Sequence, residues 1–256
     1  MISLHIDRMS YNNTFKLEKI DLDIKKNEIT LLLGHNGAGK TTIIKSLFGL
    51  VEFKGNLKLN NRVISLKKSQ DLDLFKRETS YISDELSLFD YLTPSEYFSL
   101  MKNTVTEKVD DKFLNLLIEL FELEVYLDNP ISTLSHGNKK KTQIVSQLLK
   151  QPNYIIFDEP TNGLDPDMII VLKKVLQIIK KMNIGILLST HNLSFGEELY
   201  DQIMVLRDGK IKLNASKEQV KVQYSNHTLE EIYTKVNKDY YTHIEGILHE
   251  LNQAND

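Results

Sequence analysis

One run near the N-terminus has the residue types and spacing needed to hold phosphate. It reads Gly34-His35-Asn36-Gly37-Ala38-Gly39-Lys40-Thr41 and matches G-x-x-x-x-G-K-[ST] at every fixed position. The glycines let the backbone curl so that successive N–H groups point at anionic oxygens. Lys40 can reach the β- and γ-phosphates of a nucleotide, and the Thr41 hydroxyl can face Mg²⁺. We therefore predict a triphosphate site formed by Gly34, Asn36, Gly37, Ala38, Gly39, Lys40, Thr41 and Thr42.

The sequence on either side of this run favours the phosphate site over a glycine-rich turn that matches by chance. Residues 28–33 are typical of a short buried strand running into the loop, and residues 40–48 of the helix leaving it. The start of such a helix adds unsatisfied N–H groups and a partial positive charge. The run alone indicates only a nucleotide triphosphate.

Two further apolar strands end in polar residues that could act on that triphosphate. Residues 154–157 lead into Asp158 and Glu159, and residues 184–190 lead into His191. Asp158 could hold the Mg²⁺ that Thr41 faces, and Glu159 could take a proton from an attacking water. The alternative for Asp158 and Glu159 is capping of the next helix. For His191 a satisfied turn residue stays open, and we interpret the histidines without metal spacing as structural or solvated: His5, His136, His227, His243 and His249.

A second candidate anion site lies at residues 134–141, Leu-Ser-His-Gly-Asn-Lys-Lys-Lys. Ser135 is a good helix cap. The three lysines that follow crowd the first turn, where the helix dipole disfavours cations. Either they form a solvated basic face, or the helix start binds a phosphate whose charge the lysines balance.

The remaining pattern predicts an α/β fold with a parallel sheet covered on both faces, because unbroken apolar strands alternate with helices. Periodicity and turn residues predict edge strands in 2–24 with a turn at Tyr11-Asn12-Asn13, a hairpin in 55–65 turning at Asn60-Asn61, and a short interior strand at 79–83. A helical block is expected at about 94–150, starting at Thr93, and a further helix at 167–182. After these we expect a hairpin in 202–213 turning at Asp208-Gly209, and two short helical pieces after 214 that start again at Thr228. Within 110–123 we assign Phe113, Leu117 and Leu120 to the core.

Composition narrows the class of protein. The chain has 256 residues, a formal net charge of -3 and no cysteine. The charge argues against nucleic-acid binding by bulk electrostatics, and the cysteine count excludes disulfides and cysteine metal sites. No signal-peptide block occurs, and no stretch approaches the roughly 20 apolar residues that span a bilayer. We expect a soluble chain, so that a membrane role needs a partner.

Taken together, these motifs resemble the ATP-binding subunit of an ABC (ATP-binding cassette) transporter, of the stand-alone bacterial type, from about residue 2 to 215. Residues 134–138 resemble the family's signature segment, 154–159 its second nucleotide motif, and 163–166 the loop that touches a partner subunit. His191 falls where the family keeps a switch histidine, and Tyr11 where an aromatic stacks on adenine. The resemblance implies a P-loop NTPase core with a mostly parallel sheet, an N-terminal antiparallel β subdomain and an inserted helical subdomain at about 84–150, all within 1–215. Residues 216–256 are then a short C-terminal helical extension.

This sequence departs from the family pattern at two places. The signature usually reads Leu-Ser-Gly-Gly-Gln, and here His136 and Asn138 replace the first Gly and the Gln, while Ser135 and Gly137 remain. Where the family often has Gln after the strand at 79–83, this chain has Asp84, which could bind Mg²⁺ through a water. Asp84 is shorter and charged, which puts both its metal contact and its link to a membrane partner in question.

The resemblance implies Mg²⁺-dependent ATP hydrolysis with ATP as the cofactor. Lys40, Glu159 and His191 are the catalytic candidates, Thr41, Asp158 and Asp84 the metal candidates, and Tyr11, Ser135, Gly137 and Asp165 complete the nucleotide contacts around the phosphate loop. Two copies, or this chain and a related subunit, would sandwich two ATP with the loop of one copy facing Ser135 of the other.

A separate transmembrane permease would use the closing and opening of this pair to move a substrate, which we interpret as export. The helical block 84–133 would be its docking surface. The chain would then be cytoplasmic, lie on the inner face of the cell membrane, touch the membrane only through its partner and bind no nucleic acid. The runner-up is a soluble ABC ATPase that acts on ribosomes or DNA. A non-enzymatic regulatory cassette would need Lys40 or Glu159 to be missing, and both are present.

Overall fold

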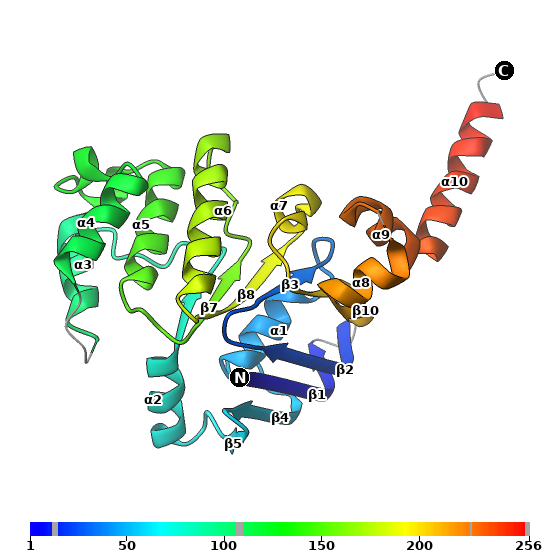
Figure 1. The fold of residues 1–256 in the computed structure, drawn as a ribbon, viewed down its shortest axis with the longest axis horizontal. Helices are drawn as coiled ribbons and strands as arrows, with labels where there is room; N and C mark the ends of the chain where they lie inside the picture. The colour runs from blue at the N-terminus through cyan, green and yellow to red at the C-terminus, as the bar shows by residue number, and fades with distance from the viewer. Residues whose placement is uncertain (12–14, 106–109, 226, 254–256) are drawn as a thin grey trace.

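In the computed structural model, residues 1–11, 15–105, 110–225 and 227–253 are described, and the side chains of Tyr11 and Phe15 are not. A sheet of six strands forms the centre of the molecule (Figure 1). Its order is β10 (Lys210–Ser216), β9 (Gln202–Arg207), β3 (Ile29–Leu33), β8 (Gly185–Thr190), β7 (Tyr154–Asp158) and β6 (Thr79–Ile82). All neighbours pair in parallel except β10, which forms the predicted hairpin with β9. Every residue of β3, β7 and β8 is buried, so the predicted parallel sheet covered on both faces is confirmed.

The strand predicted as interior at 79–83 lies instead at the edge of this sheet. β6 pairs with β7 and ends the strand order. Three of its four residues are nevertheless buried, because α2 (Ser69–Glu78) and α5 (His136–Leu148) pack against it. A covered edge strand has the same apolar composition as a central one, which is why the sequence did not separate the two.

A second sheet of four antiparallel strands carries the N-terminus. Its order is β2 (Phe15–Ile24), β1 (Ile2–Tyr11), β4 (Lys54–Leu59) and β5 (Arg62–Ile64). The alternating pattern of residues 2–24 forms one buried face, with Ile6 opposite Ile20. Asn60 and Asn61 join β4 to β5 with φ of 50° and 65°, as a two-residue hairpin turn requires. The turn predicted at Tyr11-Asn12-Asn13 lies outside the described residues.

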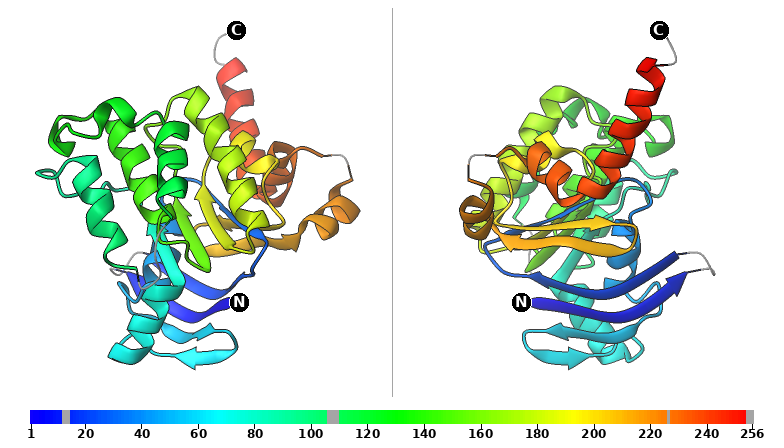
Figure 2. Two further views of the ribbon diagram at one scale, coloured as in Figure 1. Left: turned by 60° about the vertical axis from the view of Figure 1, so that its left-hand side comes forward. Right: turned by 90° about the vertical axis from the view of Figure 1, so that its right-hand side faces the viewer.

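Helix α1 (Lys40–Leu47) lies between the two sheets, as Figures 1 and 2 show. Its residues Ile43, Ile44 and Leu47 are buried in one cluster with Leu32 of β3 and with the inner face of the small sheet. The phosphate-loop helix is therefore fixed on two sides by apolar contacts, which hold its first turn at the end of β3.

Helices cover the other face of the six-stranded sheet and form a block at one end of it. They are α3 (Pro94–Lys102), α4 (Asp111–Leu120), α5, α6 (Pro166–Lys181) and α7 (Leu193–Glu197), with 3-10 turns at Glu124–Tyr126 and Ile131–Thr133. The predicted start at Thr93 is confirmed as a capping box with Glu96. In α4, Leu117 is buried and Phe113 partly so, but Leu120 is 41% exposed, against the prediction. The chain bends after α4, and Phe121 takes the buried place instead.

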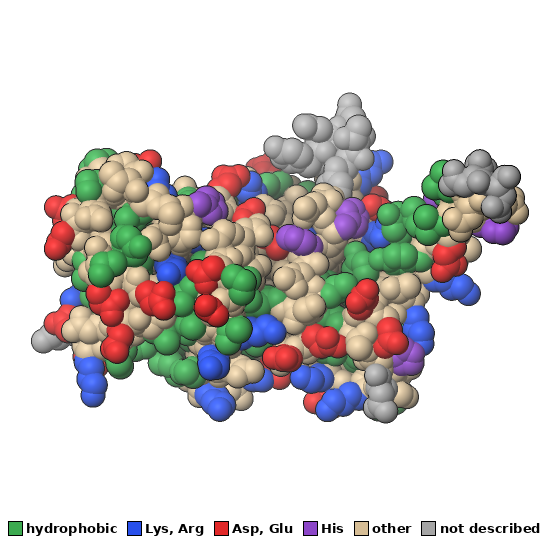
Figure 3. Space-filling model, turned by 90° about the horizontal axis from the view of Figure 1, so that it is seen from above, with side chains coloured by type: hydrophobic (Ala, Val, Ile, Leu, Met, Phe, Trp, Pro, Cys, Tyr) green, Lys and Arg blue, Asp and Glu red, His purple; other side chains and the backbone are tan. Residues whose placement is uncertain are grey.

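Residues 214–225 and 227–253 contain three helices, not the two short pieces predicted. They are α8 (Lys217–Tyr224), α9 (Leu229–Val236) and α10 (Lys238–Gln253). The start at Thr228 is confirmed as a capping box. Helix α10 buries none of its residues and projects from the body (Figure 2), and hydrophobic side chains gather near its base in Figure 3. Among the described residues, no helix has the length and hydropathy that crossing a bilayer requires.

Candidate nucleotide site

The phosphate loop connects the buried end of β3 to the first turn of α1. Gly39 precedes this helix with φ of 110°, a backbone conformation that residues other than glycine rarely adopt. Lys40 is almost fully buried, and its ammonium donates to the carbonyl oxygens of Gly34 at 2.7 Å and His35 at 3.3 Å. The cation is thus turned back over the loop, where phosphate oxygens would compete for it.

Asp158, at the end of β7, is completely buried and lies beside the loop. Ser189 Oγ donates to its Oδ1 at 2.5 Å, and Tyr81 Oη to its Oδ2 at 3.4 Å. Burial raises the pKa of the Asp158 carboxyl above its usual value, while hydrogen bonds from Ser189 and Thr41 oppose that rise. A buried carboxylate next to the Thr41 hydroxyl is the donor set that suits a hard cation such as Mg²⁺.

Glu159 follows Asp158 in a left-handed backbone conformation, with φ of 47°. This costs on the order of 1 kcal/mol or more for a residue with a β-carbon, and such strain is typical of functional positions. The turn aims the carboxylate between the Lys40 ammonium and the His191 imidazole: Lys40 Nζ lies 3.1 Å from Oε1, and His191 Nδ1 lies 2.9 Å from Oε2. The structure therefore brings together Lys40, Glu159 and His191, which lie far apart in the sequence.

Asp84 follows the edge strand β6 and lies in the same cavity as Thr41 and Asp158. A cavity of about 470 Å³ is lined by Thr41, Asp84 and Asp158 together with Tyr81 and Gln143. Asn162 donates to Asp84 Oδ1 at 2.8 Å. Within the described parts of the chain, no three acidic or histidine side chains form a protein-only metal cage. The presence of Asp84 and Asp158 in one cavity suits Mg²⁺, which usually takes one or two carboxylates and completes its shell with water and phosphate.

Ser135 and Gly137 lie apart from the phosphate loop of their own chain. Figure 1 shows α5 in the helical block and α1 under the central sheet, and the cavities lined by Thr41 or Gly34 include neither residue. Ser135 caps α5, accepting the Asn138 N–H at 3.2 Å, and stays exposed. The exposed start of α5 therefore lines neither of these cavities.

His136, which replaces the usual Gly of the family's signature segment, packs against Gly163. A β-carbon on Gly163, whose φ is 81°, would lie 2.1 Å from His136 Nδ1. Only glycine fits there, so the start of α5 and the loop at 163–166 touch within one chain. Asp165 in that loop caps α6, and its Oδ1 accepts the Met168 N–H at 2.9 Å. The side chain of Tyr11 lies outside the described residues.

The three lysines after the signature segment do not form a solvated face. Lys139 bonds Asp90 and Lys141 pairs with Glu122. Lys140 is completely buried and donates to the Ser83 carbonyl at 2.7 Å. Burial lowers the pKa of Lys140 to about 8, although the carboxylates of Asp84, Asp158 and Glu159 favour its charged form. The solvated basic face is therefore corrected, because the chain's own groups hold these lysines, whereas phosphate binding at the start of α5 stays a prediction.

Four residues of this site had no assigned role in the sequence analysis: Ser189, Tyr81, Lys140 and Gln143. Gln143 donates to Ser83 Oγ and to the Glu85 carbonyl, both at 3.1 Å, so that it and Lys140 tie the Asp84 loop to α5. For Ser189 a signal existed, since parallel pairing places it opposite Asp158. For Lys140 and Gln143 none did, because only the packing of α5 on β6 turns them inward.

The chain is similar to known proteins in both sequence and fold. A family model described as ABC transporter matches residues 17–162. The ABC-type transporter ATP-binding protein EcsA of Bacillus subtilis is 28% identical, over 90% of this chain and 93% of that protein. The lipopolysaccharide export system ATP-binding protein LptB of Haemophilus influenzae is 30% identical, over 82% and 88%.

A solved ATP-binding subunit of an ABC transporter superposes with a TM-score of 0.82 at 28% identity and covers 93% of this chain and 99% of that one. The predicted fold, with a small antiparallel sheet, a mostly parallel sheet and helical parts, is confirmed by that likeness. The family match includes the phosphate loop and covers more than half of the chain. The chain therefore belongs to the ABC transporter family as an ATP-binding subunit, an ATPase whose hydrolysis of ATP is coupled to transport.

Proposed function

We propose that this subunit binds Mg²⁺-ATP between two cassettes and uses its hydrolysis to drive export through a separate membrane permease. One observation carries the proposal: the carboxyl ends of the central strands bring together Lys40, Asp158, Glu159 and His191, while Ser135 lies exposed on another element. One chain thus holds half of a site, and a second chain supplies the other half.

In the proposed cycle each side chain has one task. The loop N–H groups of Gly34, Asn36, Gly37, Ala38 and Gly39, with Lys40, Thr41 and Thr42, hold the phosphates. Thr41 and Asp158 would hold Mg²⁺, which neutralises phosphate charge when bound, and Asp84 would act through a water. Glu159 takes the proton of the attacking water, and His191 orients Glu159. Tyr11 stacks on adenine.

The opposite cassette completes the proposed site. Ser135 and Gly137 of the other copy contact the γ-phosphate, and Asp165 lies in the loop between the copies. Only the triphosphate reaches both chains, so ATP closes the pair and hydrolysis releases it. The second cassette is this chain or a related subunit, and no nucleic acid takes part.

We assign the unit 1–215, with a helical part at about 84–150, to this cycle and treat 216–256 as an extension. The helical block 84–133 contributes to the surface on which the permease docks. The cassette would lie on the cytoplasmic side of the membrane, attached through that permease. The direction of export rests on the likeness to the Haemophilus influenzae lipopolysaccharide export subunit.

Co-purification tests the transport assignment. Tagged protein is recovered from gently detergent-solubilised membranes of its own cells, and the accompanying chains are identified by mass spectrometry. We expect a multi-span membrane protein in stoichiometric amount. Ribosomal or DNA-associated partners without any membrane protein would instead support the alternative, a soluble ABC ATPase.

The direction needs a separate measurement. In cells whose only copy carries Glu159→Gln, an exported substrate should accumulate inside and decrease in the medium relative to wild type. The opposite change, an internal deficit with the compound left in the medium, would indicate import.

A further inference from the structure

Lys140 is a completely buried lysine that the proposed cycle leaves without a task. It lies on α5, and its ammonium donates to the carbonyl oxygen of Ser83 at 2.7 Å, directly before Asp84 in the chain. Burying an ammonium costs free energy unless negative charge nearby offsets that cost. The Ser83 carbonyl is neutral, so the offsetting charge must come from other groups.

The offsetting charge comes from the nucleotide cavity. Burial lowers the pKa of Lys140, and three carboxylates oppose that shift, in decreasing order Asp84, Asp158 and Glu159. Glu159 already faces the Lys40 ammonium at 3.1 Å. The two carboxylates left for Lys140 to balance are therefore Asp84 and Asp158, which line the same cavity.

Asp84 and Asp158 repel each other in that cavity. Burial raises the pKa of Asp158, and the negative charges of Glu159 and Asp84 raise it further. The groups that hold the two carboxylates are uncharged: the Asn162 amide donates to Asp84 Oδ1 at 2.8 Å, and the Ser189 hydroxyl donates to Asp158 Oδ1 at 2.5 Å. Such donors orient a carboxylate but leave its net charge in place, so a cation close to both is needed to balance the pair.

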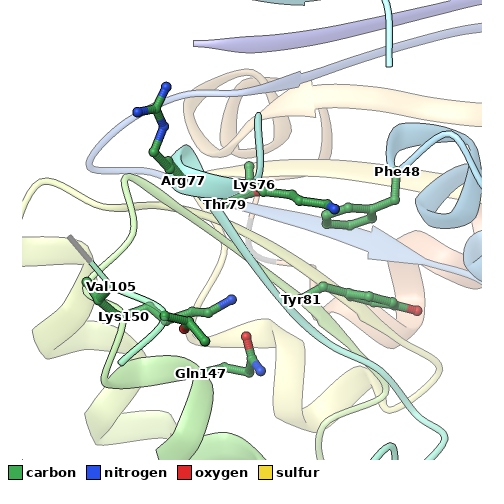
Figure 4. A pocket seen from close by; sticks show the side chains of 9 residues that line it. Phe48, Lys76, Arg77, Thr79, Tyr81, Val105, Gln147 and Lys150 are labelled. Atoms are coloured by element: carbon green, nitrogen blue, oxygen red, sulfur yellow. The ribbon is translucent and has the colours of Figure 1, made fainter. Parts of the chain in front are cut away.

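Other lysines near this part of the sheet are less suited to that task. Lys76 and Lys150 line a neighbouring pocket of about 430 Å³, between α2, β6 and the end of α5, whose described lining does not include Asp84 (Figure 4). Lys45 does line the cavity of Asp84, but it lies on α1 and is partly exposed, so water and salt screen its charge. Lys140 is fully enclosed, and its charge is screened least.

We propose that Lys140 is a positioning residue that acts as the internal counter-cation of Asp84 and Asp158. This rests on the proposed function, which gives both carboxylates a part in holding Mg²⁺. With Lys140 in place, the two carboxylates share one cavity before the nucleotide arrives and do not attract a free divalent cation into it. The metal is then taken up together with the nucleotide, whose phosphates supply further negative charge and further oxygen ligands.

Cation binding by the nucleotide-free protein tests this role, with Mn²⁺ as the probe and EPR as the measure of the free ion. Lys140→Met fills the buried space without a charge, and Lys140→Gln also keeps a hydrogen-bond donor for the Ser83 carbonyl. We expect both variants to bind one Mn²⁺ on the order of 10-fold more tightly than the wild type. Adding Asp158→Asn should remove this gain. The matched control Lys139→Met, which loses the neighbouring lysine that pairs with Asp90, should bind Mn²⁺ as the wild type does.

Asp84→Asn separates charge balance from a purely structural role of Lys140. Asparagine keeps an oxygen that can accept from Asn162 but removes the charge. In the wild-type background it leaves the lysine with less compensation and should lower the free energy of unfolding in urea. In the Lys140→Gln background it relieves the repulsion with Asp158, so it should raise that free energy and return Mn²⁺ binding to the wild-type level. If Lys140 only held the Ser83 carbonyl, Asp84→Asn would have the same effect in both backgrounds.

Mn²⁺ binding at the wild-type level in the two folded Lys140 variants would overturn the inference, and so would an equal effect of Asp84→Asn on stability in both backgrounds. Should the Lys140 variants fail to fold, Asp84→Asn alone still decides, because unchanged or raised stability in the presence of the lysine contradicts the inference. The proposed function fails by a different result: Asp158→Asn would leave Mn²⁺ binding unchanged when ATP is present. The measurements on the Lys140 variants need neither nucleotide nor a membrane subunit, so the two failures are distinguishable.

Discussion

Glu159 is held by a side chain on each side of its carboxylate. Its two oxygens face Lys40 and His191 at 3.1 and 2.9 Å, and its own backbone is held in a left-handed turn. A carboxylate fixed in this way is oriented before a substrate arrives, which is what a general base needs. The same contacts would hold the side chain of an uncharged replacement in place, so charge and geometry can be separated by mutation.

Replacing Glu159 with Gln should therefore leave ATP binding intact and lower turnover by on the order of 10²–10⁴. Glutamine keeps the shape of the side chain but cannot accept a proton from water. Steady-state phosphate release and equilibrium ATP binding measure the two effects, and Glu18→Gln, on an exposed strand position, serves as the control. Near-normal turnover by the Glu159 variant would remove this residue from the role of base.

Ser189 should set the acid limit of the Mg²⁺-dependent rate. Burial raises the pKa of Asp158, and the Ser189 hydroxyl counteracts this by stabilising the ionised form. In Ser189→Ala that hydrogen bond is lost, so the pKa rises further and a higher pH is needed to ionise Asp158 and bind the cation. We expect the acid limb of the pH–rate profile at limiting Mg²⁺ to move to higher pH. A limb at the wild-type position, or one moved to lower pH, would contradict this account.

At the scale of elements, the sequence predicted those that depend on local pattern and missed those that depend on packing. Apolar runs alone predicted the strands that precede Lys40, Asp158 and His191. Because parallel strands align their carboxyl ends, the sequence also predicted that these residues lie close together. The edge position of β6 and the inward direction of Lys140 did not follow, since both arise from contacts between β6 and α5. The long α10 was missed although its apolar residues recur at helical spacing, so a signal for it existed.

Asp165 belongs to this scale, because its side chain caps α6. Asp165→Ala should lower the free energy of unfolding by about 1 kcal/mol, the usual cost of losing such a cap. Asp165→Asn should retain most of that stability, since asparagine caps equally well. Urea unfolding of the two variants measures the cap, and their ATPase rates then separate a loss of charge from a loss of structure. Equal stability losses in both variants would show that the oxygen at this cap contributes nothing.

At the scale of the whole molecule, the two halves of the candidate site lie on different elements. The phosphate loop and its acidic neighbours lie around the central sheet, while Ser135 lies exposed at the start of α5 in the helical block. The sequence could indicate both halves as helix starts suited to phosphate. It could not show how far apart they lie, because that distance depends on how the helical block sits on the sheet.

Dimerisation with ATP tests this arrangement. The Glu159→Gln variant, 29.6 kDa as a monomer, should double its mass in light scattering when Mg²⁺-ATP is added. Adding Ser135→Glu should abolish the doubling, because a carboxylate would face the γ-phosphate, whereas adding Ser132→Glu, a neighbouring exposed serine, should not. If the Ser135 double variant still dimerises with ATP, the sandwich through this helix start is wrong.

The position of β3 also bears on how the protein is made. The strand that carries the phosphate loop is complete after Leu33, but its two neighbours in the sheet are β8 and β9, which end at Thr190 and Arg207. Pairing over such a span of sequence is slow to form and leaves the early strand exposed until its neighbours arrive. During synthesis, a nascent chain that has not yet released β9 from the ribosome lacks one whole side of the loop's support. The ability to hold a nucleotide is therefore gained late in translation, although the phosphate loop itself emerges early.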